Sequence, residues 1–248
     1  MCKRLFLLSH MRAYTSLIGH ILGSHPRING YYEMHQSYVS NADLAQQLTR
    51  YSEHDALKAD ALYQFDKLLH NDYRLNLALP ALQDAVVLIA LREPESSIKS
   101  TLNLFRQKVT AHPYAEESGA THYYIARLQA LAAFAEQHPQ RYYYFAAERI
   151  VDDTPALLTA LQQWLGLTEP LSSEYQKFAQ TGVAGAGDTS VWIHTGKVLP
   201  GLREDLACIH LADDLLQQAQ RVYQECHAHL QQCHRPVARR ENRLRRPA

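Results

Sequence analysis

The sequence predicts a three-layer α/β/α fold, in which helices cover both faces of a central parallel sheet. Three short apolar runs, at residues 4–9, 84–91 and 141–145, indicate strands buried on both faces, because they lack the alternation of a half-exposed strand. Segments with helical spacing separate these runs, and such alternation is typical of a parallel sheet. Apolar residues make up 46% of the chain, which is enough for a sizeable core.

The first predicted strand, residues 4–9, leads through a tight loop into a predicted helix over residues 15–23. Thr15 and Ser16 stand at the start of this helix, where hydroxyl residues commonly cap the first turn. Gly23 marks its end. The chain therefore opens as strand, loop and helix.

The later elements continue this alternation. Predicted helices cover residues 41–50, 56–70, 95–107, 122–137 and 154–165, with a short strand as an alternative at 65–69. Residues 84–91 predict the central strand, and residues 141–145 predict an aromatic strand. No second domain is evident, so residues 1–234 are expected to form one domain followed by a flexible basic tail over 235–248.

Residues 179–201 differ from the rest of the chain. They contain five of the ten glycines, together with Asp188 and Ser190. Long irregular segments in a compact chain are usually binding loops. We therefore expect this segment to lie at a ligand site.

The formal net charge of zero conceals an uneven distribution. Residues 235–248 carry six arginines and one glutamate, which leaves 19 basic and 24 acidic residues in the remainder. A body of that sign is not expected to bind nucleic acid. No apolar run approaches the roughly 18 residues of a membrane-spanning helix, and the N-terminus lacks the long apolar region of a signal peptide, so we expect a cytoplasmic protein.

The cysteines near the C-terminus lie at helical spacing. Cys226 and Cys233 fall on the apolar stripe of a predicted helix that starts near Leu211, with His227, His229 and His234 nearby. One helix face rarely supplies a full set of metal ligands. We therefore expect these cysteines in the core and no metal site.

Two predicted strands end in residues suited to binding anions. The loop after the first strand holds Arg12, Thr15 and Ser16 at the start of a helix, whose free N–H groups attract a phosphate. Arg92 follows the central strand, and Ser100 lies two helical turns beyond it. The first loop lacks the G-x-x-x-x-G-K-[ST] pattern, which disfavours a nucleoside triphosphate kinase.

These motifs, in this order, resemble the sulfotransferase superfamily, which has a P-loop-like fold. The resemblance covers roughly residues 4–200. It rests on the loop at 12–16, the stretch from Leu22 through Ser24-His25-Pro26 to Glu33, the pair Arg92 and Ser100, the strand and helix over 141–167, and the late motifs at 187–190 and 195–198.

The resemblance implies transfer of a sulfuryl group from 3′-phosphoadenosine 5′-phosphosulfate to a hydroxyl or amine, without a metal. It implies that the loop of Arg12, Ala13, Tyr14, Thr15 and Ser16 holds the 5′-phosphosulfate and that Arg92 and Ser100 hold the 3′-phosphate. It further implies a closing loop with Ser190, Gly196 and Lys197, a general base at Glu33, and a lysine at Lys67 near the transferred group. His35 is a second candidate for the base.

Two residues depart from the family pattern. Ala13 lacks a hydroxyl, and Tyr14 replaces a glycine that allows close backbone approach. Two alternatives therefore stay open: a catalytically weak or inactive binding protein of this fold, and a nucleotide-binding kinase-like enzyme. The acceptor, whether a small molecule, carbohydrate, lipid or peptide, is not specified by these motifs.

Overall fold

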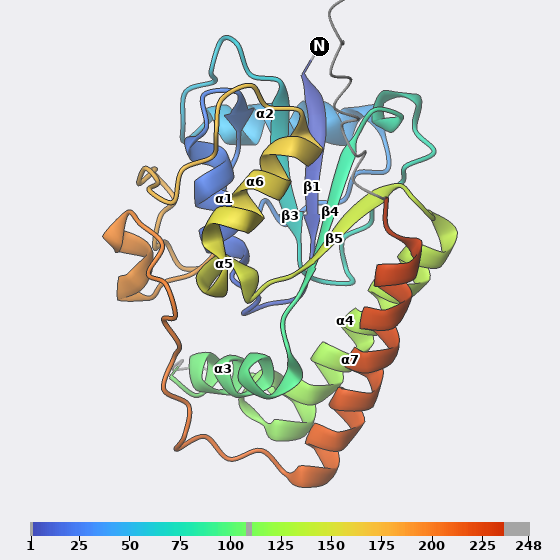
Figure 1. Ribbon diagram of the computed structural model, residues 1–248, viewed down its shortest axis with the longest axis vertical. Coiled ribbons are helices and arrows are strands. Elements are labelled where there is room, and N and C mark those ends of the chain that lie inside the picture. The colour runs from blue at the N-terminus through green and yellow to red at the C-terminus, as the bar shows by residue number, and fades with distance from the viewer. Residues whose placement is uncertain (1, 108–110, 236–248) are drawn as a thin grey trace, which may run out of the picture.

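The computed structural model describes residues 2–107 and 111–235, and a five-stranded sheet lies at its centre (Figure 1). The strands are ordered β2-β3-β1-β4-β5, and every neighbouring pair is parallel. Their bounds are β1 Lys3–Leu8, β2 Ile28–Asn29, β3 Tyr63–Leu68, β4 Val86–Leu91 and β5 Tyr142–Ala146. All the carboxyl ends therefore meet at one edge, where open parallel sheets bind their ligands.

Helices cover both faces of the sheet, which confirms the predicted α/β class with a central parallel sheet. One core packs α1 (Thr15–Ser24) and α6 (Thr154–Leu165), with the short α5 (Arg149–Asp152), against one face. The other core packs α3 (Pro94–Arg106), α4 (Glu117–Gln137), α7 (Asp213–Cys233) and Leu44 of α2 (Asn41–Ser52) against the opposite face. Figure 1 shows α1 and α6 on one side and α4 and α7 along the other.

Strand β1 shows why the apolar runs lack alternation. Leu5 and Leu7 belong to the first core, whereas Phe6 and Leu8 belong to the second. Successive side chains of a strand point to opposite faces, so a strand buried on both faces is apolar throughout. The two cores together fix β1 in the middle of the sheet.

Local capping residues set several helix bounds. Ser40 and Asp43 form a capping box at the start of α2. The Glu93 side chain accepts hydrogen bonds from the first turn of α3, and Pro94 is its first residue. Gly166, at φ 62°, ends α6 at the residue predicted.

The prediction of a helix over residues 56–70 was wrong. Residues 63–68 form β3, whose side chains are all buried, between β1 and β2. The polar residues Gln64, Asp66 and Lys67 interrupt its apolar pattern, and only pairing on both sides makes it a strand. Helix α4 also begins earlier than predicted, at Glu117 rather than residue 122.

The C-terminal region matches its prediction in part. Helix α7 buries Cys226, and Cys233 is half-buried beside the same core. Across residues 2–107 and 111–235, no group of three or more His, Cys, Asp or Glu residues could hold a metal ion. Nor does any helix of that part of the chain have the length and apolar character needed to cross a membrane. The predicted tail beyond Arg235 lies outside the described residues.

Candidate active site

A cavity of about 590 Å³ opens at the carboxyl edge of the sheet. It is lined by residues from the first loop, from the ends of β3 and β4, from the segment after β2 and from the loop at 185–204. The predicted site residues that line it are Arg12, Tyr14, Thr15, Ser16, Glu33, His35, Lys67, Arg92, Ser190 and Lys197. The fold therefore gathers most of the residues that the sequence singled out around one space.

The start of α1 faces this cavity without a cap. Its N-cap residue, Tyr14, makes no side-chain capping bond. The first i→i−4 bond runs from Ile18 N to Tyr14 O at 3.0 Å, so the N–H groups of Thr15 and Ser16 precede the helical ladder. An anion placed there would meet these donors and the positive end of the helix dipole.

The loop before α1 has a strained backbone. Arg12 and Tyr14 both have left-handed backbone angles, with φ values of 63° and 54°. A left-handed conformation costs roughly 1–2 kcal/mol for a residue with a Cβ. The intervening Ala13 is fully buried in the core, so its methyl group fixes the loop to the protein interior. Such strain is often found where a loop is shaped for binding.

Two carboxylates and a hydroxyl surround the Arg12 guanidinium. Its Nε donates to Ser100 Oγ at 2.7 Å, and its Nη atoms lie 3.4 Å from Asp188 and 3.5 Å from Glu204. Glu204 also accepts hydrogen bonds from Ser100 and from Asn103. The sequence motifs predicted Arg12 and Ser100 as site residues. They did not include Glu204, which lies in a segment without a recognisable pattern.

Arg92 joins the two predicted anion sites. It is 4% exposed, and its guanidinium carbon lies 4.5 Å above the Tyr14 ring centroid. Its Nη1 donates to the Arg12 carbonyl at 2.8 Å, while its Nε is buried without a hydrogen-bond partner. A buried unpaired donor on a cation is costly. Arg92 is thus suited to an anionic ligand that supplies the missing acceptor.

His10 holds the ends of β1 and β4 together. Its Nε2 accepts a hydrogen bond from Arg92 N at 3.1 Å, which assigns the proton to Nδ1, and Nδ1 lies 2.8 Å from the Met11 carbonyl. Complete burial lowers the pKa of His10 to about 3, so the ring is neutral at pH 7. Sequence reasoning missed this role, because one of 14 histidines carries no signal without its partners.

Ser16 connects the first loop to the late glycine-containing loop. Its Oγ accepts hydrogen bonds from Lys67 Nζ and from Asp188 N, each at 2.9 Å. With both acceptor positions used, its hydroxyl proton is directed to another oxygen. At Gly187, an added Cβ would lie 2.7 Å from Ser16 Oγ, so this close approach requires glycine. Burial is the main reason that the pKa of Lys67 is lowered.

A buried carboxylate lies in the same cavity. Glu33 is 7% exposed, and its Oε1 has no hydrogen-bond partner. His35 Nδ1 lies 3.6 Å from this oxygen and His70 Nε2 lies 3.9 Å from it. An unpaired buried carboxylate oxygen that borders a cavity is a ready acceptor for a ligand hydroxyl. The sequence singled out Glu33 and His35 but not His70.

The remaining predicted residues have distinct positions. Ser190 and Lys197 line the cavity, and Ser190 donates to Asp188 through both its N–H and its hydroxyl. Gly196 does not line the cavity; its carbonyl accepts a hydrogen bond from Tyr175 N. Ser100 is buried behind Arg12 rather than on the cavity wall.

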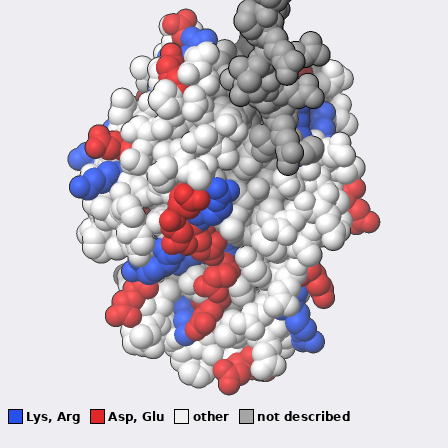
Figure 2. Space-filling model, viewed as in Figure 1, with Lys and Arg blue, Asp and Glu red and all other residues white. Residues whose placement is uncertain are grey.

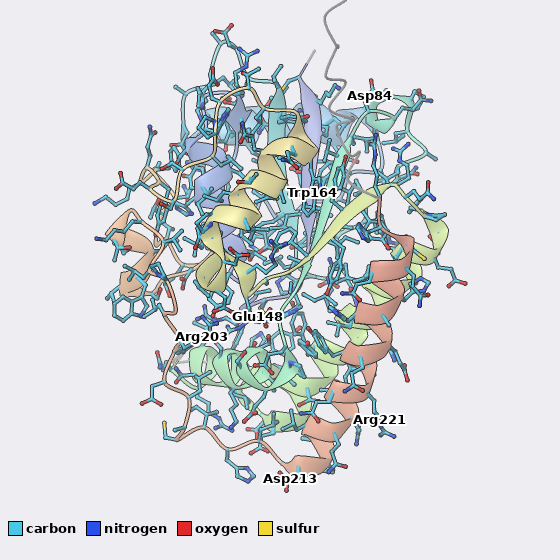
Figure 3. All side chains as sticks on the ribbon, in the orientation of Figure 1. Asp84, Glu148, Trp164, Arg203, Asp213 and Arg221 are labelled. Atoms are coloured by element: carbon cyan, nitrogen blue, oxygen red, sulfur yellow. The ribbon has the colours of Figure 1, made fainter. Side chains whose placement is uncertain are left out.

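Charged side chains of both signs also lie on the outer surface of the protein. Figure 2 shows acidic side chains with a few basic ones near the middle of the visible face. Arg203 pairs with Asp152 and interacts electrostatically with Glu148, and Figure 3 shows Arg203 and Glu148 between α5 and α3. Among the described residues that line the cavity, Arg12, Lys67, Arg92 and Lys197 carry the positive charge that an anion would meet.

Comparison with known proteins identifies this architecture. No family model and no curated protein sequence matches the chain. Among solved structures, the sulfotransferase domain from the curacin biosynthetic pathway has a TM-score of 0.62 at 18% identity, covering 91% of this chain and 97% of its own. The sulfotransferase domain of the Synechococcus PCC 7002 olefin synthase gives 0.60 at 16% identity, covering 90% and 95%. A mouse sulfotransferase complexed with PAP gives 0.56 at 10% identity, covering 90% and 83%. The chain has the fold of the sulfotransferases, as the sequence motifs predicted.

Proposed function

We propose that this protein is a sulfotransferase that uses 3′-phosphoadenosine 5′-phosphosulfate and transfers its sulfuryl group to a hydroxyl or amine. The observation that carries the proposal is the placement of the unpaired Glu33 carboxylate in the same cavity as an uncapped helix start and three buried or half-buried cations. An anion site beside a free base is what an in-line group transfer to a nucleophile requires.

The described residues fit the two ends of such a nucleotide. The uncapped N-terminus of α1, with Thr15, Ser16 and Lys67, suits the 5′-phosphosulfate. Arg92, whose Nε lacks a hydrogen-bond partner among the described residues, suits the 3′-phosphate. Ser100, the second residue expected there, donates to Glu204 and lies off the cavity wall, so it can reach a phosphate only if that contact opens. The resemblance to the sulfotransferase motifs supports the same assignment.

The chemistry divides between these residues and Glu33. When bound, the nucleotide supplies a sulfuryl group whose bond to the 5′-phosphate oxygen breaks as the acceptor oxygen or nitrogen bonds to sulfur. Glu33 takes the proton of the acceptor. Lys67, Arg12 and the N–H groups of α1 stabilise the charge that develops toward the 5′-phosphate. Ser16 orients Lys67 through their 2.9 Å hydrogen bond.

A second candidate function is a binding protein with weak or no activity. The pairing of Arg12 with both Asp188 and Glu204 favours it, because an anionic ligand must compete with two carboxylates for this cation. The two candidates differ in whether turnover follows when the nucleotide binds.

Calorimetry with 3′-phosphoadenosine 5′-phosphate, hereafter PAP, in a metal-free buffer tests the proposal. We expect saturable binding that weakens roughly 10- to 100-fold in Arg92→Ala, since a charge-assisted hydrogen bond contributes about 1.5–3 kcal/mol. Arg221→Ala, an exposed arginine on α7 (Figure 3), is the matched control and should bind normally. Absence of binding at high PAP concentration would overturn the proposal, and binding without transfer to any acceptor would favour the second candidate.

A further inference from the structure

The part of the cavity around Glu33 is walled by aromatic and imidazole rings. Six rings line it, and we call them the ring wall: His35, His70, Tyr73, Phe105, His112 and Tyr114. They come from the segment after β2, the segment after β3, the end of α3 and the turn η2 (Pro113–Ala115). Segments far apart in the chain therefore converge to give one kind of surface.

The rings of this wall form a connected set. His35 lies 5.7 Å from Tyr73 and 6.2 Å from His70, between ring centroids. On the other side, Tyr114 lies 4.6 Å from His112 and 5.2 Å from Phe105. The Tyr123 ring joins the two groups, at 5.6 Å from His70 and 5.0 Å from Tyr114. Contacts at these distances hold rings in fixed relative orientations, so the wall is preformed.

The ring wall lies next to the candidate base. His35 and His70, its two members nearest to Glu33, approach Oε1 of that residue within 3.6 and 3.9 Å. Any acceptor that presents a hydroxyl to Glu33 must therefore place its adjoining atoms against these rings.

Two carboxylates, Glu33 and Asp72, line this side of the cavity, whereas Arg50, which also acts electrostatically on Tyr73, does not line it. Asp72 lines the cavity and acts electrostatically on Tyr73 and Tyr114, and Glu33 acts on His70 and Tyr73. Among the described lining residues, the cations are Arg12, Lys67, Arg92 and Lys197. Three of these cations face the side proposed for the cofactor: Arg12 donates to Ser100, Lys67 to Ser16, and Arg92 to the Arg12 carbonyl.

Arg127 lies behind the ring wall, but its positive charge does not face a ligand in the cavity, so it does not cancel the charge of Glu33 and Asp72. It is 6% exposed and does not line the cavity. Its guanidinium donates to the carbonyls of Ser9 and Leu68 and to the side chain of Asn71. Burial also lowers the pKa of His70, so that ring presents a neutral face near pH 7.

We propose that the acceptor is an uncharged aromatic hydroxyl compound, a phenol, whose ring packs in the ring wall while its hydroxyl reaches Glu33. This inference rests on the proposed sulfotransferase function. Ring pairs contribute about 0.5–1.5 kcal/mol beyond the burial of their area, which favours a flat aromatic acceptor over a saturated one. A phenolic hydroxyl, with a pKa of about 10, also gives up its proton to a carboxylate more readily than an aliphatic alcohol does. The carboxylates of Glu33 and Asp72 disfavour acidic acceptors.

Three acceptors of one carbon skeleton test the inference. These are 2-naphthol, its saturated counterpart decahydro-2-naphthol, and the acid 6-hydroxy-2-naphthoate, each assayed with the 3′-phosphoadenosine 5′-phosphosulfate donor. We expect kcat/KM for 2-naphthol to exceed that of each of the other two at least tenfold. Equal or faster transfer to the saturated alcohol would overturn the aromatic preference, and equal transfer to the acid would overturn the charge argument.

Two ring-wall variants test whether the preference for an aromatic acceptor arises in this part of the cavity. Tyr114→Leu and Tyr73→Leu should raise KM for 2-naphthol about 3- to 10-fold while PAP affinity stays unchanged. Tyr143→Leu is the matched control, because Tyr143 packs on Trp164 and lines a different cavity at the opposite edge of the sheet. Unchanged KM in both folded variants would overturn the ring-wall assignment, and the acceptor series on the unaltered protein decides the matter if neither folds.

A binding measurement separates failure of this inference from failure of the proposed function. If PAP binds and sulfuryl transfer occurs only to saturated alcohols or sugars, the proposed function stands and the phenol inference falls. If PAP does not bind, the proposed function falls, and calorimetric titration of 2-naphthol alone still decides the inference. Saturable binding of 2-naphthol, lost in Tyr114→Leu, would support an aromatic site, and no binding would overturn it.

Discussion

The two ends of the cavity are built from different chemical groups, and we name them after the proposed function: the cofactor end at the start of α1 and the acceptor end around Glu33. The cofactor end consists of backbone N–H groups, hydroxyls and the cations Arg12, Lys67 and Arg92, all held by hydrogen bonds. The acceptor end consists of rings and the carboxylates Glu33 and Asp72. The difference indicates that one end binds by charge and direction, and the other by shape and apolar contact.

The two ends also differ in how complete their hydrogen bonding is. At the cofactor end, Arg12 has Ser100, Asp188 and Glu204 as partners, so its charge is compensated by the protein itself. At the acceptor end, Oε1 of Glu33 has no hydrogen-bond partner among the described residues, and the His35 and His70 rings lie 3.6 and 3.9 Å from it. A ligand must therefore displace protein groups to reach Arg12 at the first end, although Arg92 Nε there also lacks a partner among the described residues. At the second end the ligand supplies a missing bond to Glu33.

The largest expected effect is at the acceptor end. Glu33→Gln keeps the size of the side chain but removes the proton acceptor, so kcat should fall roughly 10²- to 10⁴-fold. PAP affinity, measured by calorimetry, should stay within about twofold because Glu33 lies outside the cofactor end. Turnover that survives the substitution would exclude Glu33 as the base, and His35→Gln, made in parallel, tests the other candidate.

The next effect is on stability against pH and concerns His10, which joins the ends of β1 and β4. The pKa of His10 is depressed to about 3 by burial, so the unfolded state binds a proton that the folded state does not between about pH 6.5 and 3. Stability is therefore fully present above pH 6.5 and is lost as the pH falls, with a slope of up to about 1.4 kcal/mol per pH unit from this group.

Denaturant unfolding from pH 7 to 4 measures this slope in His10→Gln and in the unaltered protein. The Gln amide oxygen can still accept the bond from Arg92 N but does not titrate, so the variant should lose less stability on acidification. If the free energy of unfolding falls equally with pH in the two proteins, His10 does not contribute to the loss of stability in acid.

A smaller effect is expected from the carboxylate that occupies the cofactor end. Glu204→Gln removes a negative charge from Arg12 and Ser100 while keeping a hydrogen-bonding group. We expect PAP to bind about 3- to 10-fold more tightly, since it no longer competes with a charge-assisted contact. Asp205→Asn is the control, because this neighbouring carboxylate has no contact with Arg12 or Ser100. Equal or weaker binding in Glu204→Gln would mean that Glu204 does not oppose the nucleotide.

The smallest effect concerns Tyr14. Its hydroxyl is buried without a partner, although its ring stacks under Arg92. Tyr14→Phe keeps the stack and removes the unpaired group, so it should stabilise the fold by about 1 kcal/mol and leave PAP affinity unchanged. Thermal unfolding checks this, and a destabilised variant would indicate that the hydroxyl has a partner in solution, such as water.

Much of the fold and of the cofactor end could be predicted from the sequence, because their signals are local. The strand, loop and helix at the start of the chain and the helix ending at Gly166 follow from apolar runs and capping residues. Strand β3 was predicted only as an alternative to a helix, at residues 65–69, because its polar residues are buried only by neighbours on both sides. His70 and Glu204 were missed because nothing in their own segments marks them.

By itself, the sequence determined the layered α/β class, and it singled out the start of α1 as a candidate anion site and, through the resemblance, Glu33 as a candidate base. The first two depend on residues that are close together in the chain, where backbone geometry links spacing to position. Only the tertiary structure decided that Asp188 and Glu204 compensate Arg12, that His10 joins two strand ends, and that six rings line the same cavity as Glu33. The physical reason is that burial, electrostatic pairing and ring contact depend on distance in space, which separate segments acquire only when the sheet and its two cores have formed.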